Sequence, residues 1–224
     1  MDFDNAPPFP ISEYRDLQRA IPGLEGLYRL VRAGFDSLVK DGARILIVGA
    51  GGGREIETLA ASPKRFSFIA VDPSVAMLEQ ARAYATALGA QERTTFIEGL
   101  VDDAPKQPLC DAATSLLVMH FLADDGAKAS YLQAIRDRVR AGAPLILADI
   151  SFDEPAAFER MRPMFIAHAE LVGLNADKVA RGPEMISKLP IISEARTRQL
   201  LAEAGFGSIT PLFRGLWDAM GLVQ

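Results

Sequence analysis

Four glycines and an alanine separate an aliphatic segment from a helical one early in the chain. Residues 45–48 read Ile-Leu-Ile-Val, an apolar run without helical period that predicts a buried strand. The turn Gly49–Gly53 follows, and residues 54–60 then have helical composition, with Glu55 and Glu57 where the positive helix end favours acids. Glycines here would expose backbone N–H groups that a Cβ would shield from a ligand. The stretch predicts a ligand site, although a plain tight turn could use the same residues.

The spacing of the glycines separates two classes of ligand. The dinucleotide pattern G-x-G-x-x-G/A fits Gly49 and Gly51 but puts Arg54 where a small residue allows close helix–strand packing. The alternative pattern G-x-G-x-G fits Gly49, Gly51 and Gly53. The next apolar run ends in Asp72, nineteen residues after Gly53, where an acid can accept both hydroxyls of a ribose. A helix cap is the alternative interpretation of Asp72.

Composition limits the class of protein. A chain of 224 residues with 49% hydrophobic content is long enough for one compact domain with a three-layer core. A net charge of −5 argues against a broad nucleic-acid surface. The single cysteine, Cys110, excludes an internal disulfide, and one cysteine with two histidines offers few ligands for zinc. Without an apolar run of membrane length or a signal-peptide pattern, we expect a cytoplasmic protein with no membrane contact.

Strands and helices alternate along most of the chain, which predicts a parallel sheet with right-handed crossovers. A proline-rich arm precedes a helix over 13–20 capped by Ser12, and a second helix over 24–39. The apolar face of that second helix is Leu27, Leu30, Val31, Phe35 and Leu38. The later expected strands are 93–99, 111–122, 143–150, 208–215 and 216–223, and the later expected helices are 74–89, 128–142 (with an arginine-rich exposed face) and 193–205.

The alternation stops between residues 151 and 193. Residues 152–174 read as a helical insertion bent near Pro163, followed by a loop at 181–183. An insert after the fifth strand lies above the carboxyl edge of the sheet, where open α/β folds bind ligands. We therefore expect a single domain made of an N-terminal helical cap (1–40), a ligand-binding core (41–150), a helical lid (151–192) and a C-terminal helix with antiparallel strands (193–224).

The glycine turn, Asp72, EGLVDD at 98–103 and VMHFL at 118–122 together resemble class I S-adenosylmethionine (SAM)-dependent methyltransferases, over about residues 41–150. The resemblance implies a Rossmann-like, seven-stranded, mostly parallel sheet with helices on both faces. It also implies SAM as cofactor, S-adenosylhomocysteine as product and a small organic acceptor. The implied cofactor contacts are Gly49, Ala50, Gly51 and Gly53 at the methionine, Asp72 at the ribose, Pro73, Ser74 and Met77 at the adenosine, Gly99, Leu100 and Val101 at the adenine, and Val118 and Met119 nearby.

A narrower resemblance covers nearly the whole chain. The segments 18–23 and 185–206 are similar to carboxy-SAM synthases and related small methyltransferases, and the synthases use prephenate to carboxylate SAM. The chain departs from these families at Ile47 and Leu100, where an acid is usual, and at Leu24, where the synthases have tyrosine. The nearest candidate for the synthases' carboxylate-binding arginine is Arg181. These departures favour a methyltransferase, with the synthase or a non-catalytic SAM-binding module as alternatives.

Methyl transfer depends mainly on alignment, and a base helps when the acceptor is a hydroxyl or an amine. His120, after the fourth strand, is the best-placed candidate base, although it could instead bond a loop carbonyl. Tyr14 could close over the methionine carboxylate, and His168 and Arg181 could face the acceptor. Arg160, Arg162 and Arg181 could bind a carboxylate-bearing acceptor, although we expect at least two of the three on a solvated helix face. The remaining candidates are Met161, Met164, Phe165 and Ile166, expected either to line an apolar pocket or to pack the lid. The apolar first helix also offers a surface for a homodimer.

Overall fold

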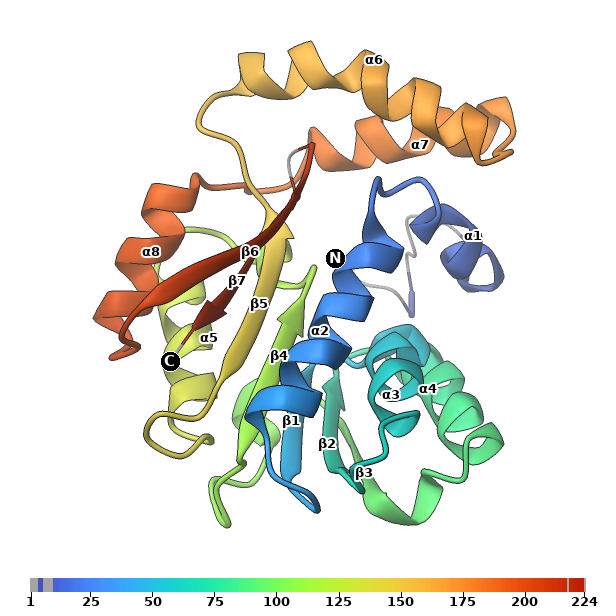
Figure 1. Cartoon of the computed structure of the whole chain (residues 1–224). Coiled ribbons are helices and arrows are strands. Elements are labelled where there is room, and N and C mark those ends of the chain that lie inside the picture. The colour runs from blue at the N-terminus through green and yellow to red at the C-terminus, as the bar shows by residue number, and fades with distance from the viewer. Residues whose placement is uncertain (1–3, 6–9, 217, 224) are drawn as a thin grey trace.

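The structure, a computed structural model, describes residues 4–5, 10–216 and 218–223. Seven strands form one sheet in the order β3-β2-β1-β4-β5-β7-β6 (Figure 1). They are β1 (Arg44–Val48), β2 (Ser67–Asp72), β3 (Thr94–Glu98), β4 (Ala112–Leu116), β5 (Leu145–Ile150), β6 (Ile209–Gly215) and β7 (Asp218–Val223). The first five pair in parallel, and β7 pairs antiparallel with β5 and β6. The predicted Rossmann-like α/β fold is confirmed.

The helices form two layers on the sheet and a cover at one end of it. They are α1 (Tyr14–Gln18), α2 (Leu24–Leu38), α3 (Arg54–Ala60), α4 (Val75–Ala87), α5 (Ala127–Arg136), α6 (Pro155–Leu171), α7 (Ala176–Ile186) and α8 (Glu194–Glu203). One face of the sheet carries α2, α3 and α4, and the other carries α5 and α8 (Figure 1). Beyond the carboxyl ends of the parallel strands lie α6, α7 and α1. No helix in the described ranges is long and apolar enough to cross a membrane.

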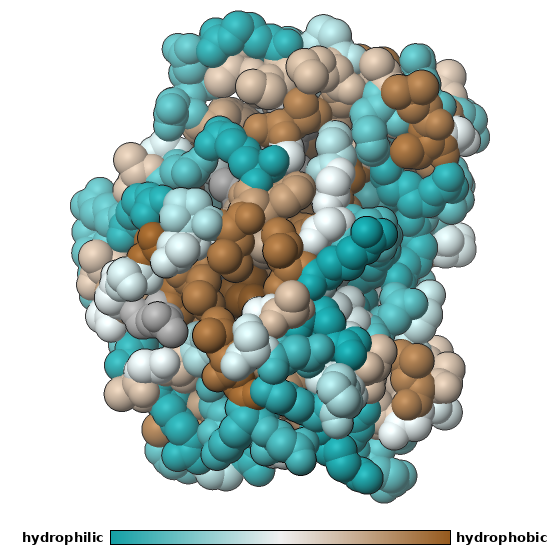
Figure 2. Space-filling model, viewed as in Figure 1, coloured by the Kyte–Doolittle hydropathy of each residue, from teal (hydrophilic) through white to brown (hydrophobic). Residues whose placement is uncertain are grey.

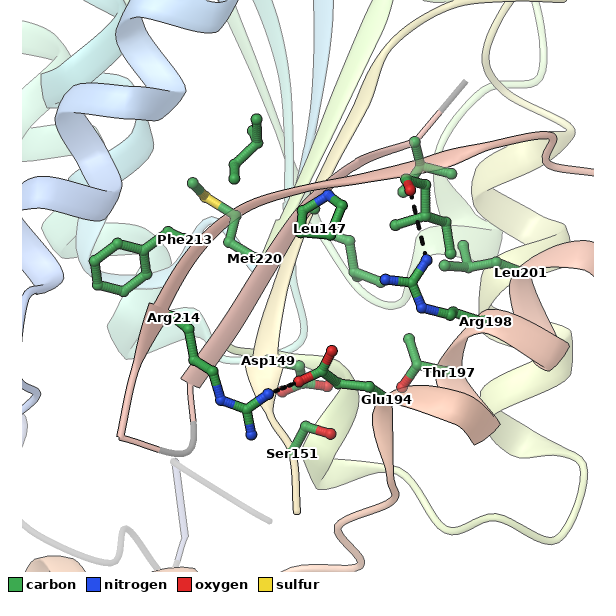
Figure 3. Close-up of a pocket in the computed structure, with 15 residues that line it drawn as sticks. Leu147, Asp149, Ser151, Glu194, Thr197, Arg198, Leu201, Phe213, Arg214 and Met220 are labelled. Atoms are coloured by element: carbon green, nitrogen blue, oxygen red, sulfur yellow. Dashed lines mark hydrogen bonds and ion pairs between the residues drawn. The ribbon is translucent and has the colours of Figure 1, made fainter. Parts of the chain in front are cut away.

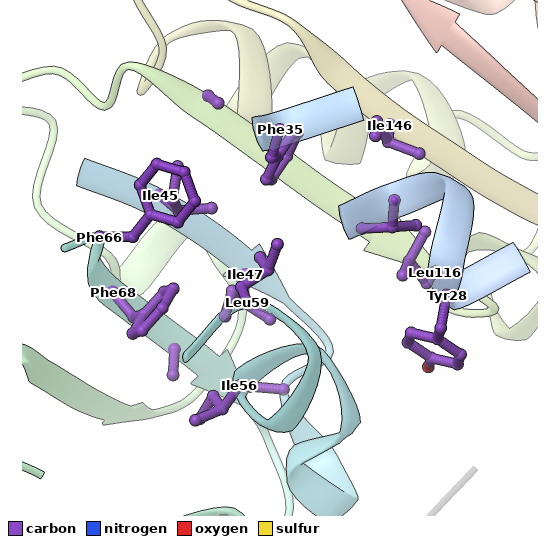
Figure 4. Packing of buried hydrophobic residues seen from close by; sticks show 14 of the residues in the cluster. Tyr28, Phe35, Ile45, Ile47, Ile56, Leu59, Phe66, Phe68, Leu116 and Ile146 are labelled. Atoms are coloured by element: carbon purple, nitrogen blue, oxygen red, sulfur yellow. The ribbon is translucent and has the colours of Figure 1, made fainter. Parts of the chain in front are cut away.

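Strand β1 is buried on both faces, as its unbroken apolar run predicts. Ile45 and Ile47 pack with Phe35 of α2 on one face (Figure 4). Leu46 and Val48 join the cluster under α5 and α8 on the other face. Successive side chains of a strand point to opposite faces, so one strand anchors both layers. The glycine turn therefore follows a strand that is packed on both faces.

Helix α2 buries three of the five residues expected on its apolar face, Leu27, Val31 and Phe35. Leu30 and Leu38 are 39% and 50% exposed, and Leu24 and Tyr28 are buried instead. Successive helical residues are about 100° apart around the axis, so Leu30 lies well away from Val31. Leu38 is the last residue of the helix.

The α2 face of the sheet is incompletely covered. Figure 2 shows apolar residues gathered at the centre of this face, in the region where Figure 1 has no helix in front of β5, β7 and β6. Leu212, Phe213 and Leu222 are only partly buried there, against the cluster that includes α2. A homodimer contact through the first helix stays a prediction.

The N-terminal helix begins differently from the prediction. Residues Ile11–Glu13 form a 3₁₀ turn, η1, and α1 follows directly. The Ser12 side chain caps neither element, because Ser12 lies inside the 3₁₀ turn rather than before a helix. Only a short helix therefore precedes the turn at Pro22 and Gly23.

The insertion after β5 contains two helices rather than one helix and a loop. Pro163 lies inside α6, which continues through it, and the predicted loop at 181–183 lies inside α7. Asn175 caps α7 by accepting a hydrogen bond from the Lys178 N–H at 3.0 Å. A Cβ on Gly182 would stand 2.8 Å from the Phe165 ring, so this glycine allows α7 to approach α6 closely. The Gly-Pro pair indicates helix packing here, not a turn.

Helix α5 ends earlier than expected, at Arg136. Arg138, expected on an exposed face, is only 2% exposed. Its guanidinium donates to the carbonyl oxygens of Ala104 at 2.8 Å and Ala134 at 2.9 Å, and also to that of Asp102. The arginine is buried because three backbone carbonyls satisfy its donors. It ties the loop after β3 to the end of α5.

Candidate active site

The glycine turn is fixed to the neighbouring strand by two hydrogen bonds. The backbone N–H groups of Gly49 and Ala50 both donate to the Val71 carbonyl at 2.9 Å. Residues Gly51–Gly53 then form a 3₁₀ turn, η2, that leads into α3. Gly49, Gly52 and Gly53 have φ values of 77°, 74° and 67°, which residues with a Cβ rarely adopt. The backbone of the turn therefore strongly favours glycine at these positions.

Other elements also press against the turn. A Cβ on Gly49 would overlap Val118, and a Cβ on Gly51 would stand 2.7 Å from Asp72 Oδ2. A Cβ on Gly52 would stand 2.5 Å from the Tyr14 ring. Three separate segments thus converge on the bare backbone of this turn. Gly53 differs, because a Cβ there would meet the Ala81 backbone of α4 at 2.9 Å, so it serves helix packing.

Asp72, at the end of β2, faces the turn. Its Oδ2 accepts from the Gly51 N–H at 2.8 Å, and its Oδ1 accepts from the Ser74 N–H at 2.9 Å. Burial raises the pKa of Asp72, the two backbone hydrogen bonds lower it, and nearby Asp4 raises it. Each carboxylate oxygen can accept more than one hydrogen bond, so the pair can still receive two ribose hydroxyls. The helix cap is Ser74, which accepts from the Met77 N–H at 3.2 Å.

A residue near the N-terminus also caps α4. The Asp4 carboxylate accepts from Ser74 Oγ at 2.6 Å and from the N–H groups of Val75 at 3.0 Å and Ala76 at 3.1 Å. Negative charge at a helix N-terminus is favourable. This contact could not be predicted from the sequence, because Asp4 lies in a segment without periodicity, far from α4 in sequence.

A cavity of about 620 Å³ opens beside the turn, above the carboxyl ends of the strands. Its lining contains most of the residues singled out from the sequence: Tyr14, Gly49, Gly51, Asp72, Pro73, Met77, Gly99, Leu100, Val101, Val118, His120 and Arg181. The predicted residues outside the lining are Ala50, Gly53, Ser74, Met119 and His168. The cofactor and catalytic roles of all these residues stay predictions.

His120 is 4% exposed and lies on η5 (Met119–Phe121), a 3₁₀ turn just after β4. Its Nδ1 is hydrogen-bonded to the Asp149 carboxylate, and its ring meets Phe121 edge-on at 4.4 Å. Asp149 Oδ1 also accepts from the Ile150 N–H at 3.1 Å. The partner of His120 is thus a carboxylate, not a loop carbonyl. A carboxylate on Nδ1 favours the tautomer that leaves a lone pair on Nε2.

Lys128 of α5 holds the turn that carries His120. It is fully buried, and its Nζ donates to the Met119 carbonyl at 2.7 Å. Burial lowers the pKa of Lys128, while Asp149 and Asp124 raise it. In the same wall, Tyr131 and Ser115 share a hydrogen bond of 2.7 Å between their hydroxyls. His120 is therefore positioned by a network of buried polar contacts.

Asp149 also borders a second cavity, of about 400 Å³, behind β5 and β7 and beneath α8 (Figure 3). Glu194 and Arg214, which form an ion pair, are among its lining residues, and Arg198 donates to the Ile209 carbonyl at 3.5 Å. This cavity has no glycine turn. The larger cavity is therefore the candidate site.

The far end of the larger cavity is mainly apolar, with Phe165, Met185 and Ile186 among its lining residues. Two cations from α7 also reach it, and both are paired with α1 and η1. Lys178 Nζ lies 2.8 Å from Asp16, and Arg181 lies 3.0 Å from Glu13. Neither cation is thus left without a counter-charge.

Several residues of the insertion are directed away from the cavity. Arg160 and Arg162 are exposed and pair with Glu154 and Glu159 at 3.4 and 3.3 Å, as expected for a solvated face. Met161 and Met164 are 37% and 61% exposed, so these two do not line an apolar pocket. Of the other two apolar candidates, Phe165 lines the cavity and Ile166 packs within the lid. His168 Nδ1 bonds the Ala20 carbonyl at 3.1 Å and connects α6 to the end of the α1 segment.

Glu55 was noted in the sequence only for its place in the first helical turn. It is 2% exposed. Burial raises the pKa of Glu55 to about 8, with a further contribution from Asp72, and Arg15 and Arg54 lower it. Ile47, where the related families usually have an acid, is fully buried in β1. The buried acid beside this turn therefore comes from α3 and not from β1.

Residues 45–142 match a family model described as a methyltransferase domain. No curated protein matches the chain in sequence. Structural similarity extends to a candidate O-methyltransferase from Nostoc punctiforme, with 15% identity and a TM-score of 0.64 over 89% of this chain and 56% of the other. An O-methyltransferase family 2 protein from Planctomyces limnophilus, solved in complex with apigenin, has 16% identity and a TM-score of 0.62 over 90% and 59% of the two chains.

The name of a third similar structure describes a dimethyltransferase that acts on an amino group. It is N,N-8-amino-8-demethyl-D-riboflavin dimethyltransferase from Streptomyces davawensis, with 19% identity and a TM-score of 0.59 over 90% of this chain and 55% of the other. The chain thus spans a little over half the length of these three structures. None of the three names describes a carboxy-SAM synthase. Residues 45–142 therefore match a methyltransferase domain, in a chain whose fold is shared with known methyltransferases.

Proposed function

We propose that this protein is a SAM-dependent methyltransferase that methylates a hydroxyl group of a small, largely apolar acceptor. The observation that carries the proposal is the position of Asp72. Its carboxylate is held between the glycine turn and the start of α4 and lines the cavity. The two carboxylate oxygens of Asp72 are held in fixed positions and can accept the ribose hydroxyls of a nucleoside. The exposed backbone of the glycine turn beside them suits the charged methionine chain that follows the ribose in SAM.

The residues around the turn fit SAM. Gly49 and Gly51 line the cavity with backbone alone, and Gly99, Leu100 and Val101 lie along the same cavity, where the adenine would bind. When bound, SAM supplies a methyl group on a positively charged sulfur. The sulfur departs as a neutral thioether, so the leaving group needs no further activation. The protein then has to orient the acceptor and exclude water. An apolar cover made of α6 and α7 would serve both needs.

His120 is the proposed general base. Its Nδ1 is bonded to Asp149, so Nε2 can take the proton of an acceptor hydroxyl, and Asp149 would stabilise the resulting imidazolium. This buried pair favours a catalyst over a non-catalytic SAM-binding module. The pair also favours an acceptor that must lose a proton on methylation, a hydroxyl or an amine. The O-methyltransferase names of two similar structures support the choice of a hydroxyl.

The acceptor is proposed to be uncharged. Lys178 and Arg181 already pair with Asp16 and Glu13, so a carboxylate-bearing acceptor such as prephenate would have to displace these acids. Phe165, Met185 and Ile186 favour an apolar, ring-containing molecule instead. Apigenin, bound by one similar structure, is a molecule of this kind.

Isothermal titration of the protein with S-adenosylhomocysteine tests the proposal. The wild type should bind it, and Asp72→Asn should weaken binding by about tenfold or more, because charge-assisted hydrogen bonds contribute about 1.5–3 kcal/mol. Asp153→Asn, a substitution of an exposed acid, is the matched control and should leave binding unchanged. Absence of binding to the wild type, or equal binding by Asp72→Asn, would contradict the proposal.

A further inference from the structure

Gln18, the last residue of α1, has a buried acceptor without a partner. The side chain lines the large cavity, and the residue is 5% exposed. Among the residues that the structure describes, its Oε1 is one of three buried side-chain atoms without a hydrogen bond, with Arg15 Nε and Thr114 Oγ1. Neither Arg15 nor Thr114 lines the cavity. An unpaired buried acceptor costs about 1–3 kcal/mol, so a donor is expected to arrive with the ligand.

Gln18 is joined to the glycine turn through Tyr14. The Gln18 amide N–H donates to the Tyr14 phenol oxygen, which leaves Gln18 Oε1 unpaired, and the Tyr14 ring lies against Gly52. Gly51 precedes Gly52 in the turn, and its backbone N–H donates a hydrogen bond to the Asp72 carboxylate. A ligand whose ribose lies at Asp72 can thus extend past the turn toward α1 and meet Gln18.

Glu55 adds a buried acid near the same region, although it is not among the residues that line the cavity. It is the second residue of α3. Burial is the main cause of the raised pKa of the Tyr14 and Tyr28 phenols, and Glu55 raises both further by its electrostatic interaction with them. The charged and titratable groups that face it are Tyr14 and Arg15 from α1, Tyr28 from α2, Arg54 from α3, Asp72 from β2 and Tyr131 from α5.

The two arginines near Glu55 are engaged elsewhere. Arg15 pairs with Glu57 at 2.7 Å and donates to the Gly52 carbonyl at 3.1 Å. Arg54 pairs with Glu25. Within the described part of the chain, Glu55 therefore forms no salt bridge, although it is buried. A buried acid and an unpaired acceptor that both neighbour Tyr14 are suited to an incoming cation that carries N–H donors.

We propose that Gln18 and Glu55 hold the α-ammonium group of the methionine part of the cofactor. This inference rests on the proposed function, because it takes the ligand to be SAM or S-adenosylhomocysteine. One N–H of the ammonium bonds Gln18 Oε1, and its charge is balanced by Glu55. The helix α1 thereby becomes part of the cofactor site and not only a cover.

Three ligands separate the parts of this contact. S-Adenosylhomocysteine has the ammonium and the carboxylate, its decarboxylated analogue keeps the ammonium alone, and 5′-methylthioadenosine lacks both. None has the sulfonium charge, so that charge cannot account for a difference. Gln18→Met and Glu55→Gln should each lower the affinity for the first two ligands by about tenfold, while the affinity for 5′-methylthioadenosine should change by less than about twofold. Gln199→Met and Glu79→Gln, on exposed helix faces, are the matched controls.

Proton release gives a second readout. With its pKa at about 8, Glu55 is mostly protonated at pH 7, and an ammonium bound beside it lowers that pKa. Binding of S-adenosylhomocysteine should therefore release close to one proton, measured by calorimetry in two buffers of different ionisation enthalpy. Glu55→Gln should remove that release. Affinity in the wild type should also rise with pH between about 6 and 8.

The outcomes distinguish this inference from the proposed function. If none of the three ligands binds the wild type, the proposed function fails and the inference fails with it. If all three bind and neither substitution discriminates between them, only the inference is overturned. Gln18→Glu, which keeps an acceptor oxygen, should retain wild-type affinity or exceed it; a tenfold loss in this variant would also overturn the inference.

Discussion

His120 and Asp149 come from neighbouring strand ends and share one buried hydrogen bond. That bond both orients the imidazole and places a negative charge where a proton transfer would create a positive one. Lys128, at the Met119 carbonyl, holds the turn in place. Each of these residues supports the next, so removal of one has a defined expected effect.

The first of these effects is on turnover. If His120 is the base of the proposed reaction, His120→Ala should lower kcat for a phenolic acceptor by about 10²–10⁴. The affinity for S-adenosylhomocysteine should stay close to the wild-type value, because the proposed base contacts the acceptor and not the cofactor. Product formation is measured by mass spectrometry, with His168→Gln as a control at the other histidine. Undiminished turnover in His120→Ala would remove the base from the mechanism.

Single residues also show how far the sequence could lead. Asp72 and the glycines were recognisable because their local spacing fixes where a strand ends and a helix begins. Asp149 was not, because it lies within the apolar run of β5, and its importance depends on His120, which is distant in sequence. Gln18 and Glu55 acquire meaning only from burial, which no local pattern specifies.

Among the elements, α7 brings residues of the insertion after β5 to the large cavity. It is capped by Asn175, lies close to α6 through Gly182, and brings Arg181, Met185 and Ile186 to the cavity. The dipeptide Gly-Pro led to the expectation of a loop, because glycine and proline usually end helices. Tertiary packing against Phe165 outweighs that preference here.

The cap of α7 can be tested separately from the cofactor. Asn175→Ala should lower the free energy of unfolding by about 1 kcal/mol, since the Lys178 N–H loses its acceptor. Fraying of α7 should raise the KM for the acceptor while the affinity for S-adenosylhomocysteine changes little. Ser193→Ala removes the corresponding cap of α8 and is the matched control, with a similar loss of stability and an unchanged KM. Equal KM effects in both variants would show that α7 has no special part in acceptor binding.

For the molecule as a whole, the contacts between the N-terminal segment and the insertion decide whether the cavity is covered. Arg181 and Lys178 pair with Glu13 and Asp16, Arg19 donates to the Val172 carbonyl, and His168 bonds the Ala20 carbonyl. Partly exposed ion pairs contribute only about 0–1 kcal/mol each, so the cover can open without unfolding the sheet. The core strands were predictable from sequence, whereas these contacts join segments more than 140 residues apart.

Opening of this cover should be visible by hydrogen exchange. The double substitution Glu13→Gln and Asp16→Asn should speed amide exchange in α1 and α7 by a few-fold, with β1 and β4 unchanged, because only weak ion pairs are lost. High salt should produce a smaller change in the same direction. Glu184→Gln, which removes the Lys188 pair on the exposed side of α7, is the control. Unchanged exchange in α1 and α7 would mean that apolar packing alone holds the cover.

The position of β1 between β2 and β4 has a consequence during protein synthesis. The glycine turn and Asp72 leave the ribosome long before β4, yet Val118, which lies against Gly49, follows β4. A nascent chain that ends before residue 118 has the recognisable motif but not the cavity. If the proposed SAM site is correct, SAM supplied to such a chain should not promote its folding, and ligand-induced protection should begin only after the strands of the second half of the sheet have been translated.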